Sequence, residues 1–276
     1  MKFDIVTIFP GFFEGPLQFG IIRRAREAKL IEVDLHDLRE HTKDRHRTVD
    51  DRPFGGGEGM VLKPEPLFEC IESLGYAPRE ERMQPGAKES VVLLSAQGRM
   101  FDQQMAQELA GFGRIAFICG RYEGVDERVA SHLADREVSI GNFVLSGGEL
   151  GAALIVDAVT RLLPGALGNE ASGRMESFTP GASEESRSGL PVSTCNTGGL
   201  LDYPHYTRPA EFRGIAVPEV LMDGDHSKIR EWRRRKALEK TLHNRPDLIE
   251  PATAAKISSD DEKILNELRR ETLRKA

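Results

Sequence analysis

The sequence predicts an α/β fold with a mainly parallel sheet, followed by a small helical domain. Two observations support this fold class. Short apolar runs alternate with segments of helical spacing as far as Gly165, and the pattern becomes helical and basic from Leu200 onward. Between them, residues 166–199 are poor in large apolar side chains. We therefore predict a domain at 1–165, a flexible linker at 166–200 and a helical domain at 201–276.

The predicted strands and helices follow one another in order. Pro10 and Gly11 end the first strand, and Pro164 and Gly165 end the last helix of the first domain. Because strands alternate with helices, we expect parallel strands with helices on both faces of the sheet. Apolar runs predict strands at 3–9, 30–38, 90–95, 114–120 and 138–146, and helical spacing predicts helices at 12–30, 64–74, 101–109, 126–133 and 149–163.

Composition limits the class of protein. The chain has 276 residues, 39% of them hydrophobic, and no apolar run approaches the roughly 18 residues of a membrane span. The N-terminal run carries Asp4 and lacks a small-residue cleavage site, which indicates a buried strand and not a signal peptide. Cys70, Cys119 and Cys195 are odd in number and far apart, which argues against a disulfide framework or a zinc site. We expect a cytoplasmic protein with no membrane segment.

Basic residues are concentrated in two runs, although the formal net charge is −6. One run spans 41–47, and the other spans 226–245 on a predicted helix. A nucleic-acid partner needs such a local basic surface, because the overall charge repels phosphate. The alternative is a solvated helix face without a ligand.

Glycine-bearing loops follow three consecutive predicted strands, at 95–99, 119–128 and 139–150. Ligands of open parallel sheets bind beyond the carboxyl ends of the strands, where glycine lets the backbone approach them. The loops predict a cleft of peptide N–H and C=O groups that suits an adenine and a ribose. The G-x-G-x-x-G and G-x-x-x-x-G-K-[ST] motifs are absent, so the ordinary dinucleotide and triphosphate sites are excluded.

Longer motifs carry a family resemblance. They are DRHRTVDDRPFGGGEGM (44–60), CGRYEGVDERV (119–129), SIGNFVLSGGEL (139–150), TRLLPGALGNEAS (160–172) and LDYPHYTRP (201–209). Together they closely resemble the bacterial tRNA (guanine-N1)-methyltransferases of the TrmD type, in the SPOUT superfamily. The resemblance implies a trefoil-knotted SPOUT domain, S-adenosylmethionine as cofactor, and a homodimer whose site joins two subunits. It also implies methylation of N1 of guanosine 37 in the anticodon arm of tRNA.

The resemblance also implies roles for individual residues. N1 of guanine carries a proton, so methylation needs a base for that proton and a cation for the charge that moves to O6. The family pattern assigns these roles to Asp202 and Arg161. The structural alternatives are a helix N-cap for Asp202 and a partner of a helix C-terminus for Arg161. Glu123 is expected to face the sulfonium or to orient the target base.

The expected binding residues form two further sets. Cofactor contacts are implied for Leu94, Ser95, Gly98, Gly120, Tyr122, Glu123, Gly124, Ser139, Ile140, Gly141, Asn142, Phe143, Val144, Leu145, Gly147 and Gly148. Contacts with tRNA are implied for Asp50, Arg230, Arg233, Arg234, Arg235 and Lys236. Magnesium is a further expectation, for which no sequence pattern defines a site.

The sequence departs from the family pattern in the linker, where an insertion at about 180–197 falls in the segment expected to close over guanine. Two alternatives stay open. One is another knotted RNA methyltransferase that acts on a ribose hydroxyl or a different base. The other is a non-catalytic RNA-binding protein that retains the knot, which would be expected to lack the Asp202 and Arg161 pair or the cofactor loops.

Overall fold

The structure, a computed structural model, describes residues 1–168, 176–179, 199–250 and 257–275. The chain divides into two compact units, Met1–Gly168 and Asn169–Ala276. Each unit is described below by itself. The insertion at 180–197 and most of the predicted linker lie outside the described residues.

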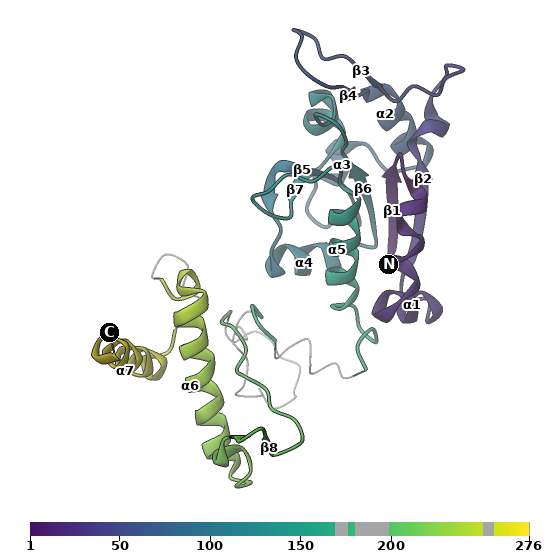
Figure 1. The fold of residues 1–276 in the computed structure, drawn as a ribbon. Coiled ribbons are helices and arrows are strands. Elements are labelled where there is room, and N and C mark those ends of the chain that lie inside the picture. Colours follow the sequence, from purple (N-terminus) through teal and green to yellow (C-terminus); the bar gives the residue numbers. More distant parts are fainter. Residues whose placement is uncertain (169–175, 180–198, 251–256, 276) are drawn as a thin grey trace. The chain divides into compact units, whose positions relative to one another are not determined.

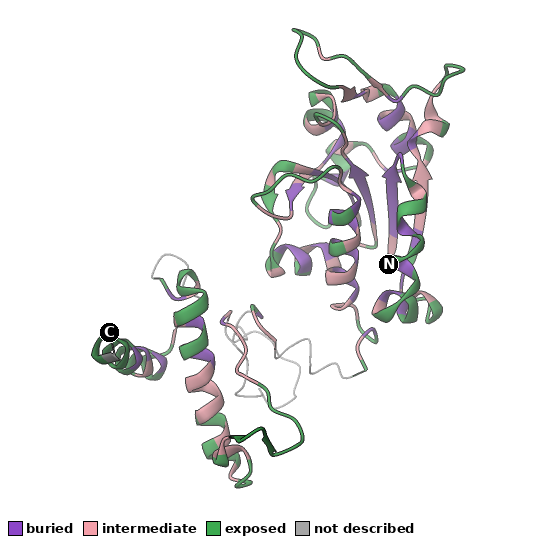
Figure 2. Ribbon diagram, viewed as in Figure 1, coloured by how far each residue is buried: buried purple, intermediate pink, exposed green. Residues whose placement is uncertain are grey.

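The first unit is built on a parallel sheet of five strands (Figure 1). They are β1 (Lys2–Thr7), β2 (Glu32–Asp37), β5 (Glu89–Met100), β6 (Arg114–Cys119) and β7 (Arg136–Ser139), in the spatial order β2-β1-β6-β5-β7. Every adjacent pair runs parallel. The prediction of an α/β fold with a mainly parallel sheet is confirmed. Central strands β1 and β6 are buried almost throughout (Figure 2).

Alternate side chains of each strand supply two separate cores, one on each face of the sheet. On one face, residues such as Phe3, Val92 and Phe117 pack with helices α1 (Gly20–Glu27), α4 (Gln103–Ala110) and α5 (Glu149–Thr160). On the other, Val6 and Leu93 pack with α2 (Pro64–Ser73) and the π-helical turn η4 (Val129–Leu133). Helices therefore cover both faces, as the alternating sequence pattern predicts.

The remaining elements of this unit are short. The strands β3 (Asp50–Asp51) and β4 (Val61–Leu62) form an antiparallel pair. The sequence pattern did not indicate helix α3 (Arg79–Arg82). The 3-10 turns are η1 (Pro10–Glu14), η2 (Pro16–Gln18) and η3 (Leu38–His41).

Several predicted elements of the first unit differ in extent. The strand expected at 90–95 continues as β5 to Met100 through the predicted loop at 95–99, and the helix expected at 126–133 is the π-helical turn Val129–Leu133. The helix expected at 12–30 is broken into η1, η2 and α1, because Gly15 and Pro16 interrupt it and proline donates no backbone hydrogen bond. The strand expected at 138–146 ends at Ser139. Its apolar continuation is exposed instead, with Val144 at 86% and Phe143 at 54%, so that apolar run does not belong to the core.

The second unit is helical, with α6 (His226–Asn244), α7 (Ser259–Lys275) and the short turns η6 (Glu219–Leu221) and η7 (Pro246–Ile249). Its core contains Leu200, Leu238, Ile249, Leu265 and Leu268. An unpredicted hairpin, β8 (Glu211–Phe212) with β9 (Ile215–Ala216), precedes the helices. Its strands are too short to show a two-residue alternation in the sequence.

Candidate active site

A cavity of about 270 Å³ lies beyond the carboxyl ends of β6 and β7 and beside residues 93–97 of β5, where the pairing of β5 with β7 changes register before β5 continues to Met100. Its walls come from the three glycine-bearing loops, and all but two of the residues expected to bind the cofactor line it. The exceptions are Gly98 and Asn142. Asn142 is exposed on the loop after β7. A Cβ atom on Gly98 would lie 2.3 Å from the backbone nitrogen of Val138, so this glycine is needed where β5 passes β7.

Bare backbone forms the floor of the cavity. The N–H of Gly148 donates a 3.0 Å hydrogen bond to the carbonyl of Gly120, which joins the loop after β7 to the loop after β6. A Cβ on Gly148 would lie 2.8 Å from Cα of Cys119 and 3.0 Å from Cβ of Leu94. Any side chain there would therefore collide with the neighbouring strand ends. The close packing of this loop on the ends of β5 and β6 therefore requires glycine at position 148.

A buried carboxylate ties these loops to the first strand. Glu149, 2% exposed, accepts a 2.8 Å hydrogen bond from Oγ1 of Thr7 and lies 3.4 Å from Nε of Arg121. Arg121 also donates to the carbonyl of Ser146 at 2.9 Å, and its guanidinium lies 4.4 Å from the ring centroid of Phe9. Neither Arg121 nor Glu149 is among the residues predicted from the sequence to form the site. Their presence within two of the quoted motifs was the available signal.

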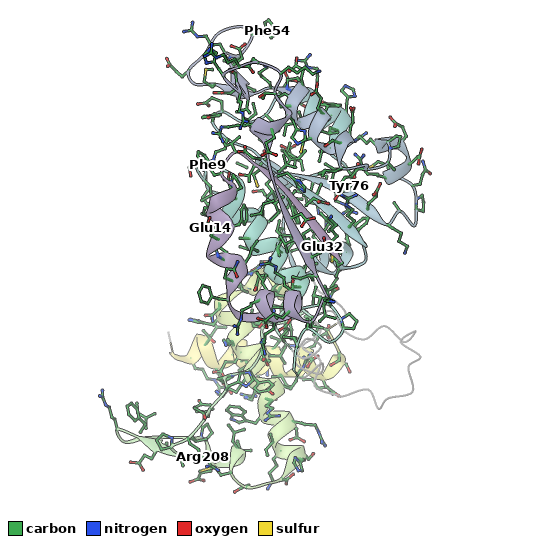
Figure 3. All side chains as sticks on the ribbon, turned by 90° about the vertical axis from the view of Figure 1, so that its right-hand side faces the viewer. Phe9, Glu14, Glu32, Phe54, Tyr76 and Arg208 are labelled. Carbon is green, nitrogen blue, oxygen red and sulfur yellow. The ribbon has the colours of Figure 1, made fainter. Side chains whose placement is uncertain are left out.

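The loop before β4 lies against the cavity. The N–H of Glu123 donates to the carbonyl of Met60 at 3.0 Å, and a Cβ on Gly59 would lie 2.6 Å from Oε1 of Glu123. Asp50 starts β3 on the same hairpin. Phe54 is fully exposed and extends from the end of this loop (Figure 3). The loop thus packs beside Glu123 while presenting an aromatic ring to solvent.

Asp202 lies in the second unit, in an irregular segment that follows Leu200. Its backbone N–H donates to Oγ of Ser177 at 2.9 Å. Its Oδ1 accepts from the N–H of Tyr203 at 2.8 Å, and its Oδ2 lies 2.8 Å from Nε2 of His205. The alternative of a helix N-cap is wrong for this residue, because α6 begins more than twenty residues later and is capped by Asp225.

Arg161 is the C-cap residue of α5, and its N–H donates to the carbonyl of Asp157 at 3.1 Å. This position agrees with the alternative of a partner for a helix C-terminus. Arg161 belongs to the first unit and Asp202 to the second. Their pairing in one site therefore stays a prediction.

Most of the basic residues of α6 have carboxylate partners. Arg234 makes bonds of 2.8 and 2.7 Å to Asp261, Arg235 contacts Glu267 and Glu271, and Lys236 lies 2.6 Å from Glu239. The Arg234 and Arg235 pairs hold α7 against α6, so the basic run has a structural use that its spacing did not reveal.

Two further basic residues of α6 differ in their surroundings from these ion-paired residues. The guanidinium of Arg233 lies 4.8 Å from the ring centroid of Tyr203. Arg230 is exposed and makes no ion pair with any residue that the structure describes. Of the residues predicted to bind tRNA, Arg230 is therefore the most available for a phosphate.

Other ligand chemistry finds little support. Burial raises the pKa of the Cys119 thiol well above its ordinary value, so this thiol is a poor nucleophile. In the described ranges, no group of three His, Cys, Asp or Glu side chains could hold a metal ion. The described ranges therefore offer the expected magnesium ion no cluster of that size. No helix in the described part of the chain is long and apolar enough to cross a membrane.

Comparisons with known proteins agree in one family. The sequence model of the family tRNA (Guanine-1)-methyltransferase TrmD matches residues 1–251. A relative from Koribacter versatilis, named tRNA (guanine-N(1)-)-methyltransferase, is 63% identical over 269 residues, which cover 98% of this chain and 98% of the relative. A relative of the same name from Geobacter metallireducens is 48% identical and covers 97% of this chain and 98% of its own. One from Moorella thermoacetica is 48% identical and covers 98% and 97%. The likeness therefore extends over both units.

Proposed function

Because the chain belongs to the tRNA (guanine-1)-methyltransferase TrmD family, we propose that it transfers the methyl group of S-adenosylmethionine to N1 of the guanosine 3′ of the anticodon in tRNA. The observation that carries this proposal is the glycine-rich cavity that the loops after β6 and β7 form beside residues 93–97 of β5. Two of the family motifs, 119–129 and 139–150, supply most of its lining.

The residues of the cavity fit the cofactor. Peptide N–H and C=O groups of the loops after β6 and β7 line the cavity and suit the edge of an adenine, and the hydrogen bond from Gly148 to Gly120 holds the two loops together. Leu94 and Ile140 supply apolar surface for its ring faces. When bound, S-adenosylmethionine supplies a methyl group on a sulfonium, which a ring nitrogen can attack. Glu123, which lines the cavity, supplies a carboxylate that favours such a positive charge.

The family pattern and the local geometry support Asp202 as the base. A carboxylate oxygen would take the N1 proton while N1 bonds to the methyl carbon, and the bond from that carbon to sulfur would break to leave a neutral thioether. Arg161 binds O6 and stabilises the negative charge that moves there, a role for which a permanently charged guanidinium is suited. The N–H of Tyr203 and the imidazole of His205 orient the carboxylate of Asp202 before guanine enters the site.

We propose that the first unit is threaded as a trefoil knot. The chain leaves β7 at the edge of the sheet and returns to its centre in α5, which packs against β1 and β6. On the way, Gly147 forms a bridge with Arg121 in the loop after β6. Such a return past an earlier loop is consistent with the threading of the family, although knots are rare among folds.

We propose that the enzyme acts as a cytoplasmic homodimer on the anticodon arm. Leu150 and Leu154 are one turn apart on α5 and remain 53% and 45% exposed. Exposed apolar side chains on one helix face favour burial against a second copy. The dimer would complete the site by bringing Asp202 of one subunit to the cavity of its partner, and Asp50 and Arg230 would contact the tRNA.

The decisive experiment offers the purified protein two unmodified tRNA transcripts that differ only in the guanine 3′ of the anticodon. With S-adenosylmethionine present, the transcript with guanine is expected to yield N1-methylguanosine on nucleoside mass spectrometry, and its partner is expected to yield none. A ribose methyl would support the other knotted RNA methyltransferases instead. Tight tRNA binding with no methyl product would support a non-catalytic RNA-binding protein.

A further inference from the structure

We propose that His205 is a positioning residue for Asp202, a role that rests on the proposed function of Asp202 as the base. Nε2 of His205 lies 2.8 Å from Oδ2 of Asp202, and the two residues are three positions apart in a segment without helix or strand. A carboxylate can only accept hydrogen bonds, so Nε2 carries the proton in this pair.

The contacts around Asp202 restrain the carboxylate on both oxygens. His205 donates to Oδ2 and the N–H of Tyr203 donates to Oδ1, each at 2.8 Å. The main chain of Asp202 is restrained as well, because its N–H donates to Oγ of Ser177 at 2.9 Å. The backbone contacts act on any residue at this position. Of these contacts, only the His205 bond depends on a second side chain and also touches the carboxylate.

Ring contacts connect His205 to Tyr203 and, through Tyr203, to Arg233. Its imidazole lies 4.7 Å from the ring of Tyr203, centroid to centroid, and the Arg233 guanidinium lies 4.8 Å from the centroid of that same ring. Nε of Arg233 is buried and has no hydrogen-bond partner among the described residues. The ring contact with Tyr203 thus helps to order this guanidinium, and it connects α6 to the imidazole. A cation over an aromatic face is favourable by electrostatic attraction to the ring.

The exposed fractions of the Asp202 and His205 side chains agree with a base that is assisted by a positioning residue. The Asp202 side chain is 21% exposed and that of His205 is 66% exposed. The exposed imidazole donates a hydrogen bond to the carboxylate and does not itself take the N1 proton. Because it faces solvent, free imidazole could enter the space left by its removal. Asp202 remains the group that takes the N1 proton. His205 fixes the plane of its carboxylate before guanine binds.

The test compares single-turnover methyl transfer by His205→Ala and His205→Gln with that of the unaltered protein. Loss of a hydrogen bond to a charged group is expected to lower the rate about tenfold or more in His205→Ala. The KM for tRNA and the affinity for S-adenosylmethionine should stay unchanged, because His205 contacts neither in this proposal. His205→Gln, whose amide N–H can reach Oδ2, should keep most of the rate. Added imidazole should restore part of the rate of His205→Ala.

Two further variants make the result decisive. Asp202→Ala gives the rate of methyl transfer without the catalytic base. His132→Ala alters an exposed histidine of η4 and is expected to keep the full rate. An unchanged rate in His205→Ala beside an inactive Asp202→Ala would overturn the inference and leave the proposed function standing. A fully active Asp202→Ala would instead refute the proposed base. A rate loss in His205→Ala that imidazole and glutamine both fail to restore would also contradict the positioning role.

Discussion

Thr7 donates a 2.8 Å hydrogen bond to Glu149 across 142 positions of the chain, and this buried contact joins the end of β1 to the start of α5. Glu149 simultaneously faces Arg121, which donates to the carbonyl of Ser146 in the cavity wall. A carboxylate in this place therefore holds the loop that ends in Gly147 and Gly148.

We expect Glu149→Ala to destabilise the protein by about 3 kcal/mol, because it leaves a buried hydroxyl and a guanidinium without their shared partner. Affinity for S-adenosylmethionine should fall as well, since the cavity wall loses its anchor. Thr7→Val is the matched control, because it removes one hydrogen bond and should cost about 1 kcal/mol. Urea unfolding and calorimetry would measure both quantities. Equal losses in the two variants would argue against an anchoring role of the carboxylate.

The floor of the cavity gives a second prediction. In Gly148→Ala, the new methyl would lie 2.8 Å from Cα of Cys119, so the loop must move, at a cost of about 1–3 kcal/mol. Cofactor binding should weaken by more than tenfold because the peptide groups move with it. Gly15→Ala is the control, since its φ is −78° and a Cβ there meets nothing within 4 Å. Calorimetric titration with S-adenosylmethionine would show the difference, and equal affinities would exclude a backbone-lined binding floor.

Two arginines on one helix should have different effects. Arg230→Ala is expected to weaken tRNA binding several-fold and to reduce the slope of log affinity against log salt by about one. Arg234→Ala should instead destabilise the second unit by about 3 kcal/mol, because it leaves the buried Asp261 without its cationic partner. Filter binding over a range of salt concentrations and thermal unfolding would separate the two effects. Loss of salt dependence in Arg234→Ala at intact stability would reverse these assignments.

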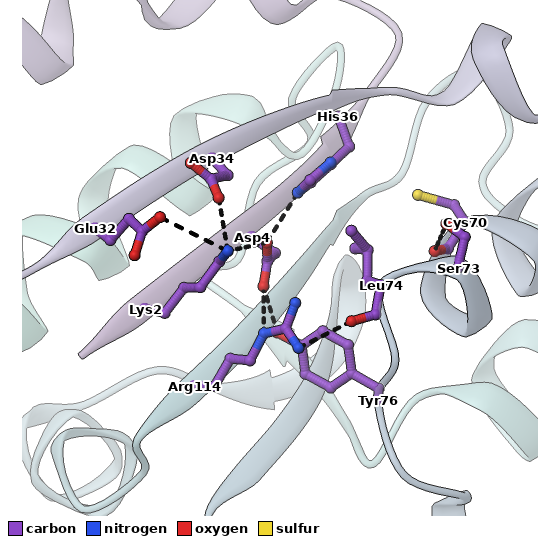
Figure 4. Close-up of polar contacts among 10 residues, drawn as sticks. All are labelled: Lys2, Asp4, Glu32, Asp34, His36, Cys70, Ser73, Leu74, Tyr76 and Arg114. Carbon is purple, nitrogen blue, oxygen red and sulfur yellow. Dashed lines mark hydrogen bonds and ion pairs between the residues drawn. The ribbon is translucent and has the colours of Figure 1, made fainter.

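Acid stability should depend on Asp4, a fully buried carboxylate on β1 (Figure 4). Burial alone would raise the pKa of Asp4, but hydrogen bonds from His36, Arg114 and Tyr76 outweigh it and lower that pKa to about 2. A lowered folded-state pKa adds stability above the unfolded value of 3.8, which is lost as the pH falls through about 2. The contribution at neutral pH is about 2 kcal/mol.

The matching variant is Asp4→Asn, which keeps the shape and removes the charge. Its free energy of unfolding should be lower than that of the parent at pH 7, and the gap should narrow as the pH falls from about 4 towards 2. Urea unfolding at several pH values would measure this gap. A gap that stays constant over that range would show that the Asp4 charge does not supply the acid dependence.

The sequence by itself determined the parallel α/β class, the glycine-bearing loops and the family, because apolar periodicity and long motifs are local properties of the chain. Strands β1 and β6 are buried almost throughout, which is why the sequence shows them as continuous apolar runs. The run from Phe143 to Leu145 looked the same in the sequence, yet it lies exposed at the cavity. An apolar run shows which residues can be buried, and only the packing of the fold decides which of them are buried.

Tertiary structure alone decided the partners of the charged residues. The bond from Thr7 to Glu149 and the pairing of Arg234 with Asp261 join positions whose separation in the chain carries no periodic signal. The contact of His205 with Asp202 spans only three positions, but an irregular segment has no repeat from which to predict it. Each of these contacts depends on where the backbone turns, and that is set by the packing of the whole unit and not by the residues in between.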